Sequence, residues 1–326
     1  MQGLAPASAL VVTDLRSQLA SDRTRVSTRM RELLAAYRGG VYDLVAYHLG
    51  WSDADGAPAA LLAGKMLRPL LCLAAARGFA GRSDGALDAA AAIELLHAFS
   101  LVHDDIEDGD TERHHRPTLW ALRGVPLAIN AGDCLFALAH RTLGGAIAAL
   151  PPERALLALR TFDDACLRMI EGQHDDLEFE SIEGITLDRY LEMSAGKTGA
   201  LIGASLALGA IFSGAPATDI ERMCSAGVAA GLAFQAIDDG LAVWGDAART
   251  GKAVGNDVSR GKKSLPAILA LSMGVAVTET SVRAETQRIA DGYARRAGDA
   301  IAATTISCQG RDELEMLIEL MVRREA

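Results

Sequence analysis

Two acidic clusters interrupt stretches of the sequence that otherwise have the pattern of buried helices. The first contains Asp104, Asp105 and Asp108, and the second contains Asp238 and Asp239. On a helix, Asp104 and Asp108 are four residues apart and therefore share one face. Carboxylates on an apolar helix need a positive partner, and their oxygens suit Mg²⁺, which usually shares its coordination with substrate phosphates. The pattern predicts a metal-bridged diphosphate site, and the alternative is a polar helix end with capping acids.

Cationic residues accompany both clusters. Arg113 follows the first cluster, and arginine binds phosphate oxygens in a bidentate manner. Lys197 lies in an apolar segment, where its charge is costly unless an anion pairs with it. Lys65 and Arg68 are three residues apart and are predicted to share one helical face, either as a phosphate clamp or as a solvated corner. His97 lies seven residues before Asp104, on about the same helical face, and this position favours a role in the same pocket.

The elements that must position these side chains are predicted to be helices. Ala and Leu are prominent, and alternating β-branched runs are scarce. Hydrophobic periodicity and breakers predict helices over residues 13–37, 41–49, 61–76, 88–108, 128–149, 152–180, 187–212 and 218–243, with three more after residue 264. The 326 residues contain no repeat, linker or composition break. We therefore expect one all-α domain over residues 13–326, preceded by a flexible tail over residues 1–12.

Composition narrows the classes of partner and location. The net charge is −10 and no basic stripe is present, so nucleic acid is not an expected partner. The five cysteines lack metal-binding spacing, and this usage predicts reduced thiols in a cytoplasmic protein. No uninterrupted apolar run reaches about 18 residues, so the chain is not expected to be an integral membrane protein.

Seven segments together resemble a known family. They are, in chain order, GKMLRP, ELLHAFSLVHDDIED, RHHRPT, GQHDDLEFE, YLEMSAGKTGALI, FQAIDDGLAVWGD and GKAVGNDVSRGKKSLP. From about Gly64 to its end the chain resembles the trans-isoprenyl diphosphate synthases of the polyprenyl synthetase family. The resemblance implies an all-α fold of antiparallel helices around a central cavity, a homodimer, and about three Mg²⁺ ions per active site.

The resemblance also implies a reaction and a role for each matching residue. The reaction is Mg²⁺-dependent condensation of isopentenyl diphosphate with an allylic diphosphate to give a short all-trans prenyl diphosphate. The implied metal ligands are Asp104, Asp108 and Asp238, with Asp105 in support. The implied ligands of isopentenyl diphosphate are Lys65, Arg68, His97 and His114. The implied ligands of the allylic diphosphate are Arg113, Lys197, Lys252 and Lys262. The implied neighbours of the developing carbocation are Thr198 and Gln235.

Two departures from the family pattern leave alternatives open. The second motif is DDGLA, so Ala242 stands in place of its last carboxylate, and His114 stands where the family usually has a second arginine. Both departures favour a class I terpene cyclase, which needs no isopentenyl diphosphate site, but the retained Lys65, Arg68 and His97 oppose it. A non-catalytic partner subunit of a heteromeric synthase is the third alternative, and the intact first motif opposes that interpretation.

The residues before the first motif bear on product length. Ser100 lies one helical turn before Asp104, and Phe99 is its neighbour. A prenyl chain whose diphosphate is held at Asp104 must extend past these two positions. In the resembling family, an aromatic residue followed by a small one goes with products of about twenty carbons. The expected product is therefore geranylgeranyl diphosphate (C20), with farnesyl diphosphate (C15) second.

Overall fold

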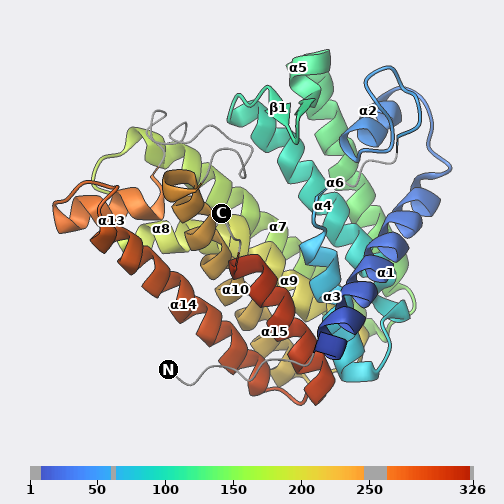
Figure 1. Cartoon of the computed structure of the whole chain (residues 1–326). Helices are drawn as coiled ribbons and strands as arrows, with labels where there is room; N and C mark the ends of the chain where they lie inside the picture. The colour runs from blue at the N-terminus through green and yellow to red at the C-terminus, as the bar shows by residue number, and fades with distance from the viewer. Residues whose placement is uncertain (1–8, 60–63, 246–262, 324–326) are drawn as a thin grey trace.

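The computed structural model describes residues 9–59, 64–245 and 263–323, and these residues are almost entirely helical (Figure 1). The first half contains α1 (Ala9–Leu34), α2 (Val41–His48), α3 (Leu67–Ala80), the 3₁₀ turn η1 (Asp84–Ala86), α4 (Leu87–Glu107), α5 (Leu119–Arg123), α6 (Val125–Ile147) and α7 (Pro152–Ser181). The second half contains α8 (Leu187–Ser194), the π-helical turn η2 (Ala195–Gly199), α9 (Ala200–Phe212), α10 (Ala217–Trp244), α13 (Leu265–Met273), α14 (Thr280–Ala302) and α15 (Cys308–Val322). A two-stranded antiparallel hairpin, β1 (Glu112–Arg113) and β2 (Arg116–Pro117), lies between α4 and α5. The all-α prediction is confirmed.

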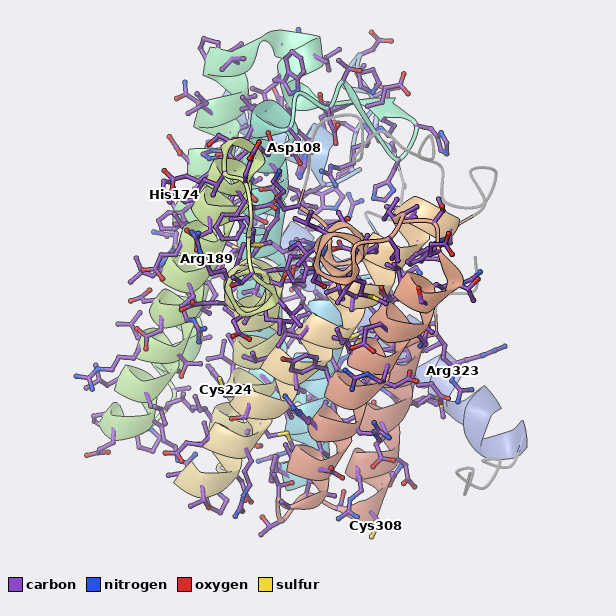
Figure 2. The ribbon with its side chains drawn as sticks, turned by 90° about the vertical axis from the view of Figure 1, so that its left-hand side faces the viewer. Asp108, His174, Arg189, Cys224, Cys308 and Arg323 are labelled. Carbon is purple, nitrogen blue, oxygen red and sulfur yellow. The ribbon has the colours of Figure 1, made fainter. Side chains whose placement is uncertain are left out.

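The long helices run along one common direction, whereas α8 and α13 are seen nearly end-on in Figure 2 and so lie across it. Figure 2 places Asp108, at the end of α4, near one end of the bundle and Cys308 at the other. α9 is buried along nearly its whole length and packs against α3, α4, α7 and α10. It therefore forms the centre of the core, and the helices that carry the acidic clusters pack around it.

Glycines bring α9 and α10 into backbone contact. A Cβ atom added to Gly227 would lie 2.5 Å from the Cα of Gly203, and one added to Gly231 would lie 2.5 Å from the Cα of Gly199. No side chain fits at these positions without a shift of the helices, because protein interiors are closely packed. This contact fixes how α10 sits against η2 and α9, and thereby where residues one turn further along α10 lie relative to η2.

Three sequence predictions differ locally from the structure. α1 begins at Ala9, so residues 9–12, predicted to be part of the tail, are helical. Lys65 precedes α3 and Met66 adopts a left-handed conformation with φ 49°, so Lys65 and Arg68 do not share a helical face. The helix predicted over residues 187–212 contains the π-helical turn η2. Single-sequence periodicity misses such a turn, because one extra residue changes the phase without ending the helix.

Three described helical stretches are long and apolar enough to cross a membrane by length and composition alone, contrary to the sequence expectation. They are Asp84–Glu107, Leu187–Phe212 and Ala217–Trp244, and 67%, 83% and 39% of their most apolar windows are buried inside the protein. In this fold the apolar residues of the first two stretches serve mainly as core.

Candidate active site

The first acidic cluster lies at the carboxyl end of α4. Asp104 is in the last turn, and Asp108 follows the helix as its C-cap residue. Burial raises the pKa of Asp104 to about 6, with further upward contributions from Asp108 and Glu107 and an opposing one from Lys197. The carboxylates therefore gather on one face, as the sequence predicted, and Lys197 of η2 is close enough to act on them.

Asp105 is held differently from its neighbour. Its Oδ1 accepts a hydrogen bond of 2.7 Å from Nε of Arg113, and the side chain is only 3% exposed. Burial raises the pKa of Asp105, and the Arg113 guanidinium opposes that rise. The supporting role predicted for Asp105 thus has a structural form, since it anchors the strand that carries the predicted phosphate ligand Arg113.

The hairpin after α4 turns through two histidines in an unusual conformation. His114 and His115 have φ values of 50° and 60°, as the two central residues of a type I′ turn do. Arg116 holds the hairpin against α2: its Nη1 donates to the carbonyl of Tyr47 at 3.2 Å, and its guanidinium lies 4.1 Å from the centre of the Tyr47 ring. Trp120 donates from Nε1 to the carbonyl of Asp110 at 2.8 Å, and this gives Trp120 a structural role.

A second cationic group lies between α3 and α4. Nη1 of Arg68 donates to Nε2 of His97 at 3.0 Å. Burial and the nearby Arg68 keep the pKa of His97 well below its usual value, so the ring is neutral and accepts this bond through Nε2. The structure thus brings together Arg68 and His97, which the sequence predicted as ligands of one diphosphate.

Two polar residues near this group were not predicted. Glu94 lies one turn before His97 on α4, and its buried Oε2 has no hydrogen-bond partner within the described residues. Burial raises the pKa of Glu94 to about 7, against the pull of Arg68. His48 of α2 hydrogen-bonds the backbone of Ala98, and burial together with Arg113 lowers its pKa to about 3. The polarity of Glu94 inside an apolar helix was the available signal, but it did not distinguish a site residue from a satisfied core group.

Lys197 projects from η2 and pairs with Asp176 of α7. α7 approaches η2 closely because position 172 is a glycine: a Cβ there would collide with the backbone nitrogen of Lys197. Asp176 was noted only as part of a polar segment, because sequence alone did not indicate which helix Lys197 would face. The anion partner expected for Lys197 therefore includes a carboxylate of the protein itself.

The second acidic cluster is part of a hydrogen-bonded chain. Thr198 of η2 donates from its hydroxyl to Oε1 of Gln235 at 2.8 Å, and Nε2 of Gln235 donates to Oδ1 of Asp239 at 2.8 Å. Oδ2 of Asp239 accepts from the Tyr190 hydroxyl at 2.7 Å and from the backbone N–H of Leu265, also at 2.7 Å. The predicted pair Thr198 and Gln235 is thus confirmed as neighbours, whereas Tyr190 was missed.

The remaining predicted residues fall into two groups. Asp238 is exposed on α10, next to Asp239, and Ala242 lies one turn further along. Lys252 and Lys262 lie outside the described residues, as does Asp246, so the structure describes neither their contacts nor their distance from the acidic clusters.

Phe99 and Ser100 differ in their surroundings. The Phe99 ring is 9% exposed and makes edge-on contacts with Phe136 of α6 and with His103, at centroid distances of 5.2 Å and 4.9 Å. Ser100 is half-buried, and its hydroxyl donates to the carbonyl of His97 at 2.9 Å. The large ring therefore belongs to the contact between α4 and α6, and the small side chain leaves space beside it.

The donor set fits a hard divalent cation. Asp104 and Asp108 supply carboxylate oxygens from one helix face, and their mutual repulsion raises the pKa of Asp104. Among the described residues, no three His, Cys, Asp or Glu side chains come together as a complete metal site. Mg²⁺ does not require such a set, because it commonly binds one or two carboxylates and takes its other oxygens from water and phosphate.

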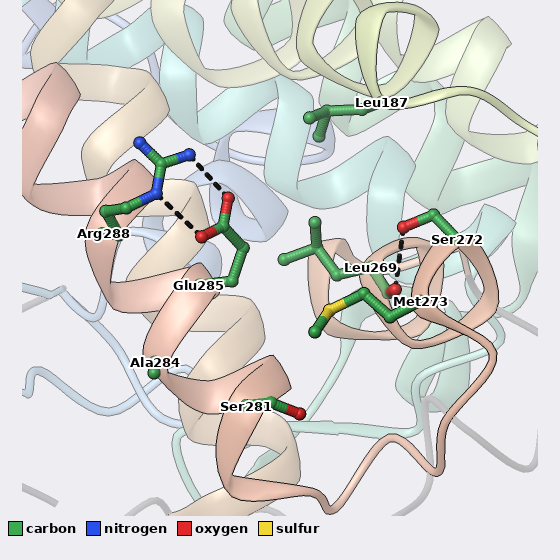
Figure 3. A pocket seen from close by; sticks show the side chains of 8 residues that line it. All are labelled: Leu187, Leu269, Ser272, Met273, Ser281, Ala284, Glu285 and Arg288. Carbon is green, nitrogen blue, oxygen red and sulfur yellow. Dashed lines mark hydrogen bonds and ion pairs between the residues drawn. The ribbon is translucent and has the colours of Figure 1, made fainter.

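A hollow elsewhere on the surface contains none of the predicted site residues. It lies between α8, α13 and α14, and Figure 3 shows the Glu285–Arg288 ion pair at its side. Its lining residues are Leu187, Leu269, Ser272, Met273, Ser281, Ala284, Glu285 and Arg288. The chemistry of the acidic clusters therefore does not extend into it.

Comparison with known proteins gives a consistent result. Residues 57–294 match the polyprenyl synthetase family. A geranylgeranyl diphosphate synthase of Mycobacterium tuberculosis is 44% identical over 257 residues, which are 78% of this chain and 70% of that protein. A (2E,6E)-farnesyl diphosphate synthase of Mycobacterium bovis is 42% identical over 231 residues, which are 71% of this chain and 63% of that protein. The crystal structure of a polyprenyl synthetase from Streptomyces coelicolor superposes with a TM-score of 0.88 and 32% identity, and the match covers 94% of this chain and 99% of that one.

An all-α fold with two acidic helix clusters and cations around them defines the class of helical prenyltransferases that act on diphosphates. The chain belongs to the polyprenyl synthetase family and is a prenyltransferase of the trans-isoprenyl diphosphate synthase type. Because these relatives carry synthase names, the comparisons support the synthase interpretation over the cyclase and partner-subunit alternatives.

Proposed function

We propose that the chain condenses isopentenyl diphosphate with an allylic diphosphate to give an all-trans prenyl diphosphate. The observation that carries this proposal is that Lys197 of η2 acts electrostatically on Asp104 while Arg113 is anchored on Asp105 beside it. Cations from two segments distant in sequence therefore meet the first acidic cluster. Such an arrangement suits a diphosphate, whose charge needs both metal and cationic side chains.

The residues divide the two substrates between them. Lys197 and Arg113 bind the allylic diphosphate, and the family resemblance adds Lys252 and Lys262. Arg68 and neutral His97, joined by their 3.0 Å hydrogen bond, bind the diphosphate of isopentenyl diphosphate together with Lys65 and His114. Because Arg68 keeps its full charge and His97 remains uncharged, the guanidinium supplies the attraction and the imidazole fixes its direction.

The reaction forms one carbon–carbon bond. The C1–O bond of the allylic substrate breaks and its diphosphate leaves with the electron pair. The C3–C4 alkene of isopentenyl diphosphate attacks C1, and a proton is then lost from C2, for which the departing diphosphate is the base. Thr198 and Gln235, hydrogen-bonded at 2.8 Å, lie beside the developing positive charge.

We also propose that this enzyme uses Mg²⁺, about three ions by resemblance to the family. Asp104 and Asp108 would hold metal at the first cluster, and exposed Asp238 would hold it at the second. The bound ions stabilise negative charge that develops on the leaving diphosphate. The protein's contribution is to gather the carboxylates and to exclude other partners from them.

We propose geranylgeranyl diphosphate (C20) as the product, with farnesyl diphosphate (C15) second. Support comes from Phe99, whose ring is wedged against Phe136 and His103, beside the small Ser100. The two relatives described above carry one of these product names each, so the ring at Phe99 is the feature of this chain that supports a length.

We propose further that the protein is a cytoplasmic homodimer. Exposed aliphatic residues gather on the outer faces of α6 and α7, and this α6–α7 surface comprises Leu127, Ile129, Leu156, Leu167 and Ile170, each at least 41% exposed. Such a surface is typical of a protein–protein contact. All five cysteines are free thiols, in keeping with a reducing compartment.

The proposed function is tested by incubating the protein with Mg²⁺, isopentenyl diphosphate and each allylic diphosphate in turn, and by identifying the products. We expect a prenyl diphosphate longer than the allylic substrate, no product with EDTA, and a loss of turnover of at least about a hundredfold in Asp104→Ala. The matched control is Asp299→Ala, an exposed acid on α14 far along the chain. Unchanged turnover in EDTA would show that the metal mechanism is wrong, and products formed without isopentenyl diphosphate would show a cyclase.

A further inference from the structure

A buried hydrogen-bonded chain connects α8 to the residues beside the reacting carbon. It runs from the Tyr190 hydroxyl to Asp239, then to the side-chain amide of Gln235, and ends at the Thr198 hydroxyl. The side chains of Tyr190 and Thr198 are 2% and 6% exposed, so the two ends of this chain are shielded from solvent. None of the bonds is longer than 2.8 Å.

The chemistry of each group fixes the direction of every hydrogen bond. The Asp239 carboxylate only accepts, and its Oδ2 already takes the Tyr190 O–H and the Leu265 N–H. Gln235 must therefore turn its NH₂ group toward Oδ1, because its carbonyl oxygen has no proton to give. Its oxygen then faces Thr198 and takes the hydroxyl proton.

The outcome of this ordering is a defined polarity at Thr198. With its proton committed to Gln235, the Thr198 oxygen can present only lone pairs to a neighbour. Lone pairs stabilise a positive charge on carbon, whereas a hydroxyl proton directed at that charge would repel it. A side chain at the far end of the chain thus controls which pole of a hydroxyl group the substrate meets.

We propose that Tyr190 is a positioning residue for prenyl transfer, acting through Asp239 and Gln235 to hold the Thr198 hydroxyl with its lone pairs toward the allylic carbon. This inference rests on the proposed function, which places Thr198 and Gln235 beside the developing carbocation. Tyr190 is itself held in place, because it accepts a hydrogen bond from the Ser194 side chain and its ring lies in a buried apolar cluster with Leu265 and Ile289. Neither Tyr190 nor Asp239 needs to touch substrate.

The test compares two tyrosine variants of the full-length enzyme. Tyr190→Phe removes the hydroxyl that orients Asp239, and Tyr293→Phe removes a hydroxyl from a half-buried ring that packs against the same cluster. For Tyr190→Phe we expect kcat to fall about tenfold, with the KM for both substrates changed less than about twofold. Tyr293→Phe should match the wild type in kcat and KM. A loss of stability alone would not produce this separation of kcat from KM.

A double-mutant cycle with Thr198→Val identifies the route of the effect. Valine has no hydroxyl, so Tyr190→Phe should lower kcat no further in the Thr198→Val background. The proposal is wrong if Tyr190→Phe and Tyr293→Phe have the same kcat, or if the effects of Tyr190→Phe and Thr198→Val multiply. If Tyr190→Phe does not fold, Gln235→Glu replaces it, because a carboxylate at position 235 cannot donate to Asp239. A wild type that forms no isopentenyl-dependent product contradicts the proposed function, whereas an active wild type with an unaffected Tyr190→Phe contradicts only this proposal.

Discussion

Neighbouring acids of the same motif differ in charge state because their partners differ. Asp105 has Arg113 at 2.7 Å, whereas Asp104 has like charges from Asp108 and Glu107 around it. The second cluster shows the same division, with Asp239 accepting three hydrogen bonds and Asp238 exposed. In each cluster one acid anchors the structure and its neighbour is available to a ligand.

The raised pKa of Asp104 predicts a pH dependence of Mg²⁺ binding. Because this pKa is about 6, above the ordinary value of 3.8, the carboxyl group is protonated below pH 6 and must lose its proton before it binds metal. Mg²⁺ affinity should therefore fall as the pH drops through 6, and should be nearly constant above 7. Calorimetric titration of Mg²⁺ into the enzyme at pH 5 to 8, in buffers of different ionisation enthalpy, should show about one proton released per site at pH 5. Equal affinities at pH 5 and pH 8 would contradict the assignment of Asp104 as a ligand.

His114 occupies a strained turn where the family usually has arginine. His114→Arg should lower the KM for isopentenyl diphosphate, since a permanent charge and a bidentate donor replace an imidazole that is mostly neutral at pH 7. The KM for the allylic substrate should change little. His115→Arg is the matched control, because it adds the same charge at the adjacent turn residue with φ 60°. If His114→Arg and His115→Arg bind isopentenyl diphosphate equally well, position 114 is not in that site.

Phe99 gives a prediction about product length. Phe99→Ala should lengthen the main product by one or more five-carbon units, because removal of the ring opens a cavity beside Ser100 along the path of the chain. It should also reduce the free energy of unfolding by roughly 3 kcal/mol, as large-to-small changes in a core do. Chromatography of the dephosphorylated products measures the length, and Phe79→Ala on α3 controls for lost stability. An active Phe99→Ala enzyme with the wild-type product would show that Phe99 is ordinary core.

Element boundaries were predictable where a breaker or a cap marks them. α2 and α7 begin and end within a residue or so of the predicted limits, and Thr186 caps α8 by accepting from the N–H of Arg189. The start of α3 was wrong because left-handed Met66 is not a residue type that announces a break. The pairing of Lys197 with Asp176 could not be predicted, because hydrophobic periodicity shows which face of a helix is buried and not which helix covers it.

Close contact between α7 and η2 leads to a prediction at the level of helix packing. Gly172→Ala should displace η2, since the new Cβ would collide with the Lys197 nitrogen, and a rigid backbone cannot give way cheaply. We expect the free energy of unfolding to drop by about 1–3 kcal/mol and kcat to fall with it. Gly298→Ala is the control, because nothing lies within 4 Å of a Cβ at that helical position, and it should be neutral or slightly stabilising. Denaturant unfolding and steady-state kinetics measure both quantities, and equal behaviour of the two variants would contradict the packing argument.

At the scale of the whole molecule, the α6–α7 surface predicts association. Wild-type protein should have twice the 34.2 kDa mass of one chain in light scattering. Leu167→Glu places a charge on a side chain that is 58% exposed on this surface, and it should shift the protein toward the monomer. Leu271→Glu is the control, at a position 69% exposed on α13. A dimer that is unaffected by Leu167→Glu would place the contact elsewhere.

The π-helical turn between α8 and α9 has a consequence for insertions and deletions. It holds one residue more than an α-helix of the same rise, and each residue turns a helix by about 100°. Excision of one residue from Ala195–Gly199 would restore an unbroken helix and rotate α8 by about 100° relative to α9. Tyr190 would then face away from Asp239, although no loop had changed length and every side chain of the hydrogen-bonded chain were still present. In this chain, a single codon within a helix decides whether two side chains 49 residues apart in sequence can meet.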